Sequence, residues 1–435
     1  MKLGFVSMPL TGHLNPMTAL ARRLQSRGND VVFFGVPDAE PIVRAANLDF
    51  VPICEQEYPP GSIAKEYGYL ATLRGEDVVR YSARELHPRR LRATFEHLPE
   101  KLAATGVDAL IIDTIHFFVE LVPMSMGMPY VHIWNILHID RSGATPPCFF
   151  DWPHEATPEA RARNMEGVKK MGSYFAPIAA VARDFAEKKG LQIDWSQPSV
   201  STSRLAVIAQ TPKEFDFPGS PWPPKFHYAG PFQDGGGRAP IPFPWEQLTG
   251  EPLIYASMGT LVNGLEHVYR SILQAVSKLP ATQVVLSVGD HIRVDDLGPI
   301  SSNVIIVAKA PQLELLKRAA LCITHAGLNT TLEALTQGVP MVAIPIGFDQ
   351  PGVAARIAYH GVGEFVAEGS LTAERLLQLI RTVMNNPGYG EKARNLQRVI
   401  AQTQGLDLAA DLIERALGKH QPSASAEPSP ALSTV

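Results

Sequence analysis

Short apolar runs alternate with amphipathic stretches along most of the chain. In the first half the apolar runs predict buried strands at residues 3–8, 31–35, 50–53, 109–113 and 130–134. Helical periodicity predicts helices at residues 16–27 and 41–46, with Asn15 as N-cap and Pro16 in the first helical position. Strands that alternate with helices are typical of a doubly wound parallel sheet.

The same alternation resumes in the second half. Strands are predicted at residues 253–257, 283–288, 304–308, 321–324 and 341–344. Helices are predicted at residues 265–278, 312–319, 328–337 and 351–359, and three further helical stretches end near Leu417. Two such series predict an α/β protein with two Rossmann-like domains that face a central cleft.

Segments rich in proline and glycine set the expected domain boundaries. Residues 218–244 contain a Pro-Trp-Pro-Pro run, three consecutive glycines and a second proline cluster, which indicates a linker. We therefore expect an N-terminal domain at 1–217, a C-terminal domain at 245–400 and a helix at 401–418 that packs back on the first domain. Weaker patterning at 142–201 predicts an insertion with helices at 156–171 and 176–189, and the composition of 419–435 predicts a disordered tail.

Composition narrows the function classes. The 435 residues exceed one ordinary core, and the net charge of −4 excludes a basic nucleic-acid surface. The three cysteines lie far apart, so neither a zinc site nor a disulfide framework is expected, and a reducing compartment is favoured. The first apolar run is cut by Pro9 and is too short for a signal peptide, and no run is long enough for a membrane span. We expect a cytoplasmic monomer or weak dimer, able to lie peripherally on a membrane.

The most informative residues follow the strand at 321–324, because ligands in such sheets bind at the carboxyl ends of strands. Gly327 allows close approach to the backbone, and the helix start offers free N–H groups to an anion. His325, Asn329 and Thr330 add side-chain donors, which together suit a diphosphate. Further along, carboxylate and amide groups suit sugar hydroxyls; these are Glu333, Asp349 and Gln350.

The ordered motifs from residue 310 to residue 350 resemble the C-terminal signature of the family 1 UDP-glycosyltransferases, in the style of the bacterial macrolide and carotenoid branch. The resemblance implies the GT-B fold, inverting chemistry and no metal or other cofactor. It implies that His325, Asn329, Thr330 and the Gly327 backbone contact the diphosphate. It further implies ribose binding by Glu333, a nucleoside contact by Gln312, sugar binding by Asp349 and Gln350, and a phosphate-contacting turn that contains Ser257 and Thr260.

One position departs from this family pattern. The family usually places Trp or Tyr two residues before the proline of its Pro-Gln pair, where the ring stacks on uracil, and here that residue is Lys309. An aliphatic stem can cover a base but has no flat π face. The Ala310 backbone remains available to the base edge, and the choice of UDP over another nucleotide stays open.

The loop after the first strand, residues 11–16, resembles the acceptor-side motif of the same family. The resemblance implies that His13 is the general base that deprotonates the acceptor hydroxyl, with Gly12 beside it on the donor side. Asp113 ends a strand and is the candidate that orients the imidazole. His116 and His132 lie near it in sequence and could compete as partners, but packing roles are expected for both.

Aromatic residues gather between residues 117 and 152, and about half of them should be core. The expected acceptor pocket takes Phe117, Phe118, Trp134 and Phe149. The resulting hypothesis is an enzyme that transfers a hexose, glucose, from a UDP-sugar to a hydroxyl of an apolar small molecule that is phenolic, polyketide or carotenoid-like.

Three other functions are alternatives to this hypothesis. A nucleotide-sugar 2-epimerase on the same fold needs carboxylates around C2 of the sugar and no acceptor pocket. A non-catalytic nucleotide-sugar-binding helper needs neither His13 nor Asp113. A Rossmann dehydrogenase is disfavoured because no GxGxxG follows the first strand.

Overall fold

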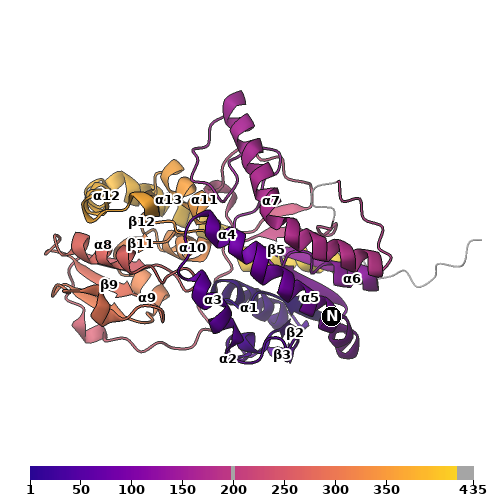
Figure 1. The fold of residues 1–435 in the computed structure, drawn as a ribbon. Helices are drawn as coiled ribbons and strands as arrows, with labels where there is room; N and C mark the ends of the chain where they lie inside the picture. Colours follow the sequence, from indigo (N-terminus) through magenta and orange to yellow (C-terminus); the bar gives the residue numbers. More distant parts are fainter. Residues whose placement is uncertain (197–200, 419–435) are drawn as a thin grey trace, which may run out of the picture.

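The computed structural model describes residues 1–196 and 201–418 and shows two α/β units side by side (Figure 1). The first unit contains a seven-stranded parallel sheet with the order β3-β2-β1-β4-β5-β6-β7. Its strands are β1 (Lys2–Val6), β2 (Asp30–Gly35), β3 (Asp49–Pro52), β4 (Ala109–Asp113), β5 (Tyr130–Trp134), β6 (Val207–Ala209) and β7 (Phe226–Tyr228). The central strands β1 and β4 are almost wholly buried, as expected for a parallel sheet covered on both faces.

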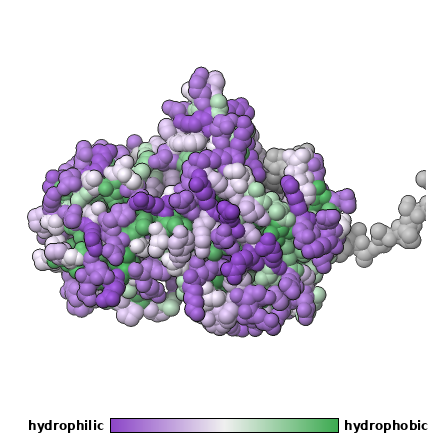
Figure 2. All heavy atoms as spheres, viewed as in Figure 1, coloured by the Kyte–Doolittle hydropathy of each residue, from purple (hydrophilic) through white to green (hydrophobic). Residues whose placement is uncertain are grey.

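Seven helices belong to the described part of this first unit. They are α1 (Thr11–Ser26), α2 (Glu40–Ala45), α3 (Ser62–Leu70), α4 (Glu76–Tyr81), α5 (His87–Thr105), α6 (Leu121–Met126) and α7 (Pro158–Lys188). A π-helical turn, Ser82–Leu86, joins α4 to α5 without a break. The start of α7 projects from the body of the molecule, and mainly hydrophilic side chains cover it (Figure 2).

The second unit is a six-stranded parallel sheet with the order β10-β9-β8-β11-β12-β13. Its strands are β8 (Leu253–Ser257), β9 (Gln283–Ser287), β10 (Val304–Val307), β11 (Ala319–Thr324), β12 (Met341–Ala343) and β13 (Gly363–Phe365). Its helices are α8 (Glu266–Val276), α9 (Gln312–Leu316), α10 (Leu328–Thr336), α11 (Gln350–Tyr359), α12 (Ala373–Asn385) and α13 (Pro387–Thr403). The expected fold class, two doubly wound parallel-sheet domains, is therefore confirmed.

The last helix, α14 (Gly405–Gly418), leaves the second unit and packs against α1 of the first. Its apolar face joins the core cluster that contains β1, with Ile413 fully buried. Arg23 on α1 and Arg27, the residue that follows α1, pair with Asp407 and Asp411 on α14. The chain thus crosses twice between the two units.

The start of α1 was predicted wrongly. The helix begins at Thr11 rather than at Pro16, so Asn15 is not its N-cap, and the residue before the helix, Leu10, makes no side-chain cap. A proline inside a helix has no N–H for the carbonyl four residues earlier, which is that of Gly12. The side-chain amide of Asn329 on α10 donates to this Gly12 oxygen instead, so a contact from the other unit supplies the missing donor.

Two other expectations need correction. The helices expected at 156–171 and 176–189 form the single helix α7, which runs through Pro177 because residues on both sides of the proline, such as Met171 and Ile178, are buried against the first unit. The linker expected at 218–244 contains β7, which pairs with β6, so the first unit extends to at least residue 228. Residues 197–200 of the expected insertion and the expected tail at 419–435 lie outside the described residues. Among the helices that the structure describes, none is long and apolar enough to cross a membrane.

Candidate active site between the two sheets

The pair expected to act as base and orienting acid is formed at the carboxyl ends of β1 and β4. These strands are hydrogen-bonded neighbours, which brings the first turn of α1 close to Asp113, the last residue of β4. His13 Nδ1 lies 2.8 Å from Asp113 Oδ2, and Ser7 Oγ donates to the same oxygen at 2.8 Å. The Ile115 N–H donates to the other oxygen, Oδ1, at 3.4 Å, and the carboxylate is fully buried, so these partners hold it in one position.

The environment of His13 favours its protonated form. Burial by itself lowers the imidazole pKa, but the charge and hydrogen bond of Asp113, with a smaller contribution from Asp349, raise that pKa above 6.5. Nε2 has no hydrogen-bond partner among the residues that the structure describes and is the nitrogen left to take a proton from a substrate. An imidazole with one nitrogen fixed by a carboxylate and the other free is suited to general-base chemistry.

The neighbouring histidines differ from one another. His132 faces away from the pair, because its Nδ1 accepts from the Ser203 N–H at 3.0 Å and its Nε2 lies 3.7 Å from Glu120. His116 is buried, and burial together with Arg90 lowers its pKa to about 4. Neither contacts Asp113 with a ring nitrogen in the part of the chain described.

His87 is a site residue that the sequence analysis missed. Burial, then Arg90, His116 and His13, lower its pKa to about 3, so it is a neutral donor and acceptor close to the proposed base. Its ring also meets Phe117 edge-on at 5.5 Å. The π-helical turn that precedes it shifts the register of the helix, a feature often found at functional sites, and no simple periodicity in the sequence reveals it.

On the facing unit, the start of α10 fits a diphosphate. The residue before the helix, Gly327, makes no side-chain cap, so the first N–H groups remain available to an anion. The His325 ring lies between Gly259 and Gly327, where an added Cβ would come within 2.5 Å and 2.4 Å of Nε2. Ala326, between His325 and Gly327 in the chain, has a left-handed backbone (φ 63°), a strained conformation that is typical of functional turns.

The His325 imidazole is neutral at physiological pH. Burial lowers its pKa to about 4, and Nδ1 has no hydrogen-bond partner among the described residues. Ser257 is buried close by, and its Oγ accepts from the Gly259 N–H at 3.4 Å, whereas Thr260 is exposed. The structure therefore brings His325, Ser257 and the two glycines together and leaves Thr260 at the edge.

Asn329 and Thr330 occupy the first turn of α10 but are already engaged. Asn329 donates to the Gly12 carbonyl and accepts from Gln210 Nε2 at 2.9 Å. Thr330 Oγ1 accepts from Gln312 Nε2 at 3.3 Å. These contacts connect the first turn of α10 with α1, with Gln210 and with Gln312.

Glu333 lies one turn further along α10 and is 2% exposed. Gln312 Nε2 donates to Oε2 of Glu333 at 2.5 Å, and the Tyr255 hydroxyl donates to the side-chain oxygen Oε1 of Gln312 at 2.9 Å. Arg238, from the segment between the units, donates to Oε1 at 2.5 Å. Chain order alone did not reveal this arginine, because it lies 95 residues from its partner.

Lys309 points away from these groups. Its ammonium is exposed and pairs with Asp290 at 3.1 Å, while Ala310 is buried and its carbonyl accepts from the Gln312 N–H at 2.8 Å. No aromatic ring stands where the family pattern places one.

Of the two residues expected at the sugar end, Asp349 contacts the first unit, whereas Gln350 bonds within its own unit. Asp349 Oδ2 accepts from the Leu137 N–H at 2.9 Å, and burial raises the pKa of Asp349 despite the opposing effects of that bond and of His13. Gln350 Oε1 accepts from the N–H groups of Ile346 and Gly347, which leaves its amide nitrogen free of these bonds.

Two further polar residues close this end of the cleft. Asn135 and Gln210 follow β5 and β6 directly and are almost fully buried. Neither side-chain polar atom of Asn135 has a partner among the described residues, and an unpaired buried amide is costly unless a ligand satisfies it. A polar residue directly after an apolar strand is the signal that could have marked both as site residues, but only Trp134 was predicted to lie there.

The aromatic residues expected in the acceptor pocket divide into two groups. Phe117 and Phe149 both meet Phe175 of α7, with ring centroids 4.9 Å and 5.9 Å away. Phe118 instead lies against Trp195 at 6.0 Å, and Trp134 is half-buried at the end of β5. The long helix α7 thus supplies a ring to the group beside His87.

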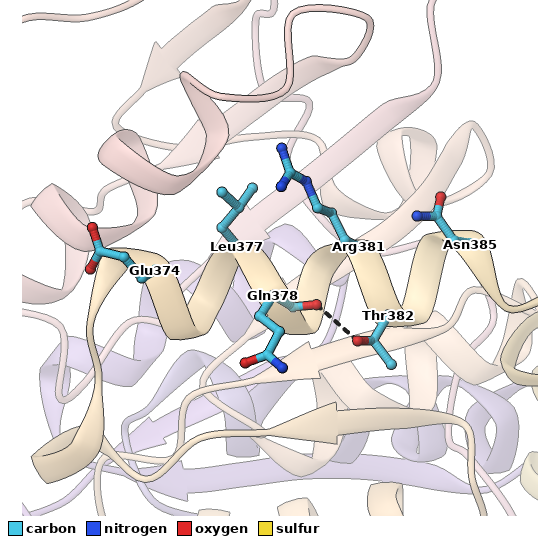
Figure 3. A pocket seen from close by; sticks show the side chains of 6 residues that line it. All are labelled: Glu374, Leu377, Gln378, Arg381, Thr382 and Asn385. Atoms are coloured by element: carbon cyan, nitrogen blue, oxygen red, sulfur yellow. Dashed lines mark hydrogen bonds between the residues drawn. The ribbon is translucent and has the colours of Figure 1, made fainter.

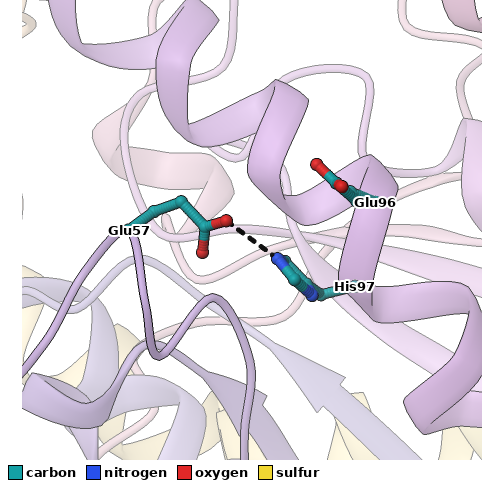
Figure 4. Close-up of side chains that lie close together, drawn as sticks. All are labelled: Glu57, Glu96 and His97. Atoms are coloured by element: carbon teal, nitrogen blue, oxygen red, sulfur yellow. Dashed lines mark hydrogen bonds and ion pairs between the residues drawn. The ribbon is translucent and has the colours of Figure 1, made fainter.

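Two surface features lie apart from this cleft. Glu57, Glu96 and His97 approach one another on the first unit (Figure 4), where His97 Nε2 lies 3.0 Å from Glu57 Oε1 and both glutamates are exposed. A hollow on the second unit is lined by one helix only, α12, so no second element converges on it (Figure 3). Neither feature shares a residue with the candidate site.

Comparisons with known proteins show which family model, relatives and solved structures this chain resembles. A family model described as UDP-glucoronosyl and UDP-glucosyl transferase matches residues 151–420. The zeaxanthin glucosyltransferase of Pantoea ananas is 26% identical over 429 residues, which is 96% of each chain. The calicheamicin glycosyltransferase CalG4 has a TM-score of 0.72 at 21% identity, covering 97% of this chain and 99% of its own. The glycosyltransferase VinC, solved in complex with dTDP, has a TM-score of 0.69 at 19% identity, covering 96% of this chain and 100% of its own.

These likenesses extend over nearly the whole chain, and the two-sheet architecture is the GT-B fold. The family model alone covers well over half of the residues. The chain therefore belongs to the UDP-glycosyltransferase family and is an enzyme that transfers a sugar from a nucleotide sugar to an acceptor.

Proposed function

We propose that this glycosyltransferase moves glucose from UDP-glucose to a hydroxyl of an apolar small molecule, with inversion at the anomeric carbon and without a metal. The observation that carries the proposal is the 2.8 Å contact between His13 Nδ1 and the buried Asp113. His13 Nε2 takes the proton of the acceptor hydroxyl, and the hydroxyl oxygen forms the new bond to the anomeric carbon as the bond to the diphosphate breaks.

The other side of the cleft is suited to the leaving group. The open N-terminus of α10 and the neutral His325 offer donors to the diphosphate oxygens, which gain negative charge as the sugar departs. Asp349, beside His13, and the free amide of Asn135 lie at the sugar end.

An aromatic and histidine-lined acceptor region supports an apolar hydroxylated acceptor. Phe117, Phe149 and Phe175 supply apolar surface, and His87 supplies a neutral polar group near His13. The zeaxanthin glucosyltransferase relative acts on a carotenoid, and we extend that class, with phenols and polyketides, to this enzyme.

The test is a mass-spectrometric screen of phenols, macrolides and carotenoids against UDP- and dTDP-sugars, followed by NMR of the new glycosidic bond. An α-configured donor should give a β-linked product, and chelation with EDTA should leave the rate unchanged. His13→Ala should reduce kcat by about 10²–10⁴-fold while UDP binding persists. A variant with near-normal turnover contradicts the assignment of the base.

Conversion of a UDP-sugar without acceptor would instead favour a 2-epimerase. Nucleotide binding with no product in any combination would favour a helper protein.

A further inference from the structure

Residues 234–238 form a strap between the two units, on the side of the site where the nucleoside is expected. At one end, Asp234 pairs with Arg22 of α1. At the other end, Arg238 pairs with Glu333 of α10. The strap therefore connects the helix that carries His13 with the helix that begins at the diphosphate site.

The first end of the strap is closely fitted. The Arg22 guanidinium lies so near Gly237 that an added Cβ would be 1.8 Å from Nη1, and a Cβ on Gly236 would be 3.3 Å from Nη2. Gly235 and Gly237 both have positive φ, which allows the chain to turn tightly here. Glycines also make this short segment easy to rearrange, because few steric barriers restrict their backbone.

At the second end, Arg238 pairs with Glu333, the carboxylate that is expected to bind the ribose. Both oxygens of Glu333 have a partner, Arg238 on Oε1 and Gln312 on Oε2, and the carboxylate is 2% exposed. Ribose hydroxyls would donate to this carboxylate and need the space around it. Gln312 is held from behind by Tyr255, whereas the Arg238 side chain is one-third exposed and can swing into solvent.

We propose that Arg238 gates the nucleoside end of the donor site: its guanidinium holds Glu333 when no nucleotide is bound and must leave before the ribose can bind. Arg238 then lowers nucleotide affinity and slows nucleotide association. This inference rests on the proposed function and on the family resemblance, which implies that Glu333 binds the ribose.

The alternative is that Arg238 only neutralises a buried carboxylate and so stabilises the fold. The two roles predict different changes in nucleotide affinity when Arg238 is removed. A gate predicts that loss of the arginine tightens binding, because Glu333 is then free to accept ribose hydroxyls. A purely structural role predicts a lower unfolding temperature with unchanged or weaker binding.

The experiment measures UDP binding to the full chain by calorimetry and its association rate by stopped flow. Arg238→Ala should lower the Kd about tenfold, which corresponds to about 1.4 kcal/mol, and raise the association rate. Arg238→Gln keeps a neutral donor and should give an intermediate Kd, which also serves if the alanine variant does not fold. The matched control is Arg270→Ala, which removes an exposed arginine and its ion pair with Glu266 on α8, and its Kd should equal that of the wild type.

An unchanged or higher Kd in both Arg238 variants overturns the gate. If the wild type binds neither UDP nor dTDP, the proposed function itself fails, and the two failures are thereby distinguished.

Discussion

His13 and Asp113 are 100 residues apart in the chain, yet one pair of adjacent strands makes them neighbours. The hydrogen bond from Ser7 to the same carboxylate fixes the direction from which His13 can approach. The contact between His13 and Asp113 therefore depends on the sheet register between β1 and β4 as much as on the two residue types.

The raised pKa of His13 has a measurable consequence for rate. If His13 is the base, as proposed, its neutral imidazole is the active form, so kcat/KM should fall as the pH decreases through a His13 pKa that lies above 6.5. Asp113→Asn removes the charge that raises this pKa, so the acidic limb should move to lower pH while the maximal rate falls by about 10²–10⁴-fold. The pH profile of kcat/KM checks both effects, and an unmoved acidic limb would show that another group titrates.

His325 depends on two glycines for its position. Gly327 has an ordinary φ, so Gly327→Ala tests the steric effect alone: its Cβ would lie 2.4 Å from His325 Nε2 and displace the ring. We expect kcat/KM for the donor to fall at least about tenfold, equivalent to about 1.4 kcal/mol. Gly172→Ala on α7, where a Cβ meets nothing within 4 Å, is the control and should leave kcat/KM unchanged. Equal values for the two variants would rule out this role of Gly327.

At the scale of elements, α14 shows how a helix from one end of the chain completes the core of another unit. Its buried residues lie in the same apolar cluster as β1 and α1, while charged residues line the rim of the contact. Burial of apolar side chains outweighs partly exposed ion pairs in free energy.

This difference predicts unequal effects of two substitutions at the same contact. Ile413→Ala, in a fully buried position, should lower the free energy of unfolding by about 2–5 kcal/mol. Arg27→Ala, which removes partly exposed pairs with Asp411 and Glu414, should lower it by about 1 kcal/mol or less. Urea unfolding followed by circular dichroism measures both, and the reverse order would mean that the charges dominate.

The elements also show where prediction from sequence succeeds. Short apolar runs predicted the central strands of both sheets but not β6, β7 and β13, and the motif from residue 310 to residue 350 predicted the polar groups that gather around the start of α10. Each successful prediction depends on residues close together in the chain. The start of α1 was missed because Asn329, 317 residues away, supplies the donor that Pro16 lacks. Arg238 and His87 were missed for the same physical reason, since Glu333 and His13 come from distant segments. Asn135 was missed although its position directly after β5 could have marked it.

At the scale of the whole molecule, a buried charge network joins the two units. Asp216 of the first unit accepts from Arg356 of α11 at 2.8 Å and 2.9 Å, from His138 at 2.7 Å and from Tyr228 at 2.5 Å. Burial would raise the pKa of Asp216, but His138 and Arg356 outweigh it and hold the pKa well below 3.8. Because α11 begins at Gln350, this network also helps to position Asp349 and Gln350, where the sugar is expected.

Removing only Asp216 should destabilise the protein more than removing Asp216 and Arg356 together. Asp216→Asn should lower the free energy of unfolding by about 3–5 kcal/mol, because Arg356 is then buried without a counter-charge. Adding Arg356→Met should recover part of this loss, and a double-mutant cycle of urea unfolding measures the recovery. A depressed carboxyl pKa contributes stability at neutral pH that is lost as the pH falls below 3.8, so the wild type should lose this contribution in acid and Asp216→Asn should not. Additive losses in the double variant would contradict the coupling.

The bond between Asn329 and the Gly12 carbonyl connects the first turn of α10 to the first turn of α1. If Asn329 contacts the diphosphate, as the family resemblance implies, its amide exchanges the Gly12 carbonyl for a phosphate oxygen when the nucleotide binds. The free energy of binding is then the difference between two sets of hydrogen bonds, and part of what is gained from the phosphate is given up at the carbonyl. On the same expectation, the Gly12 carbonyl accepts from the amide again after sugar transfer, so the nucleotide product should leave more easily than its phosphate contact alone would suggest.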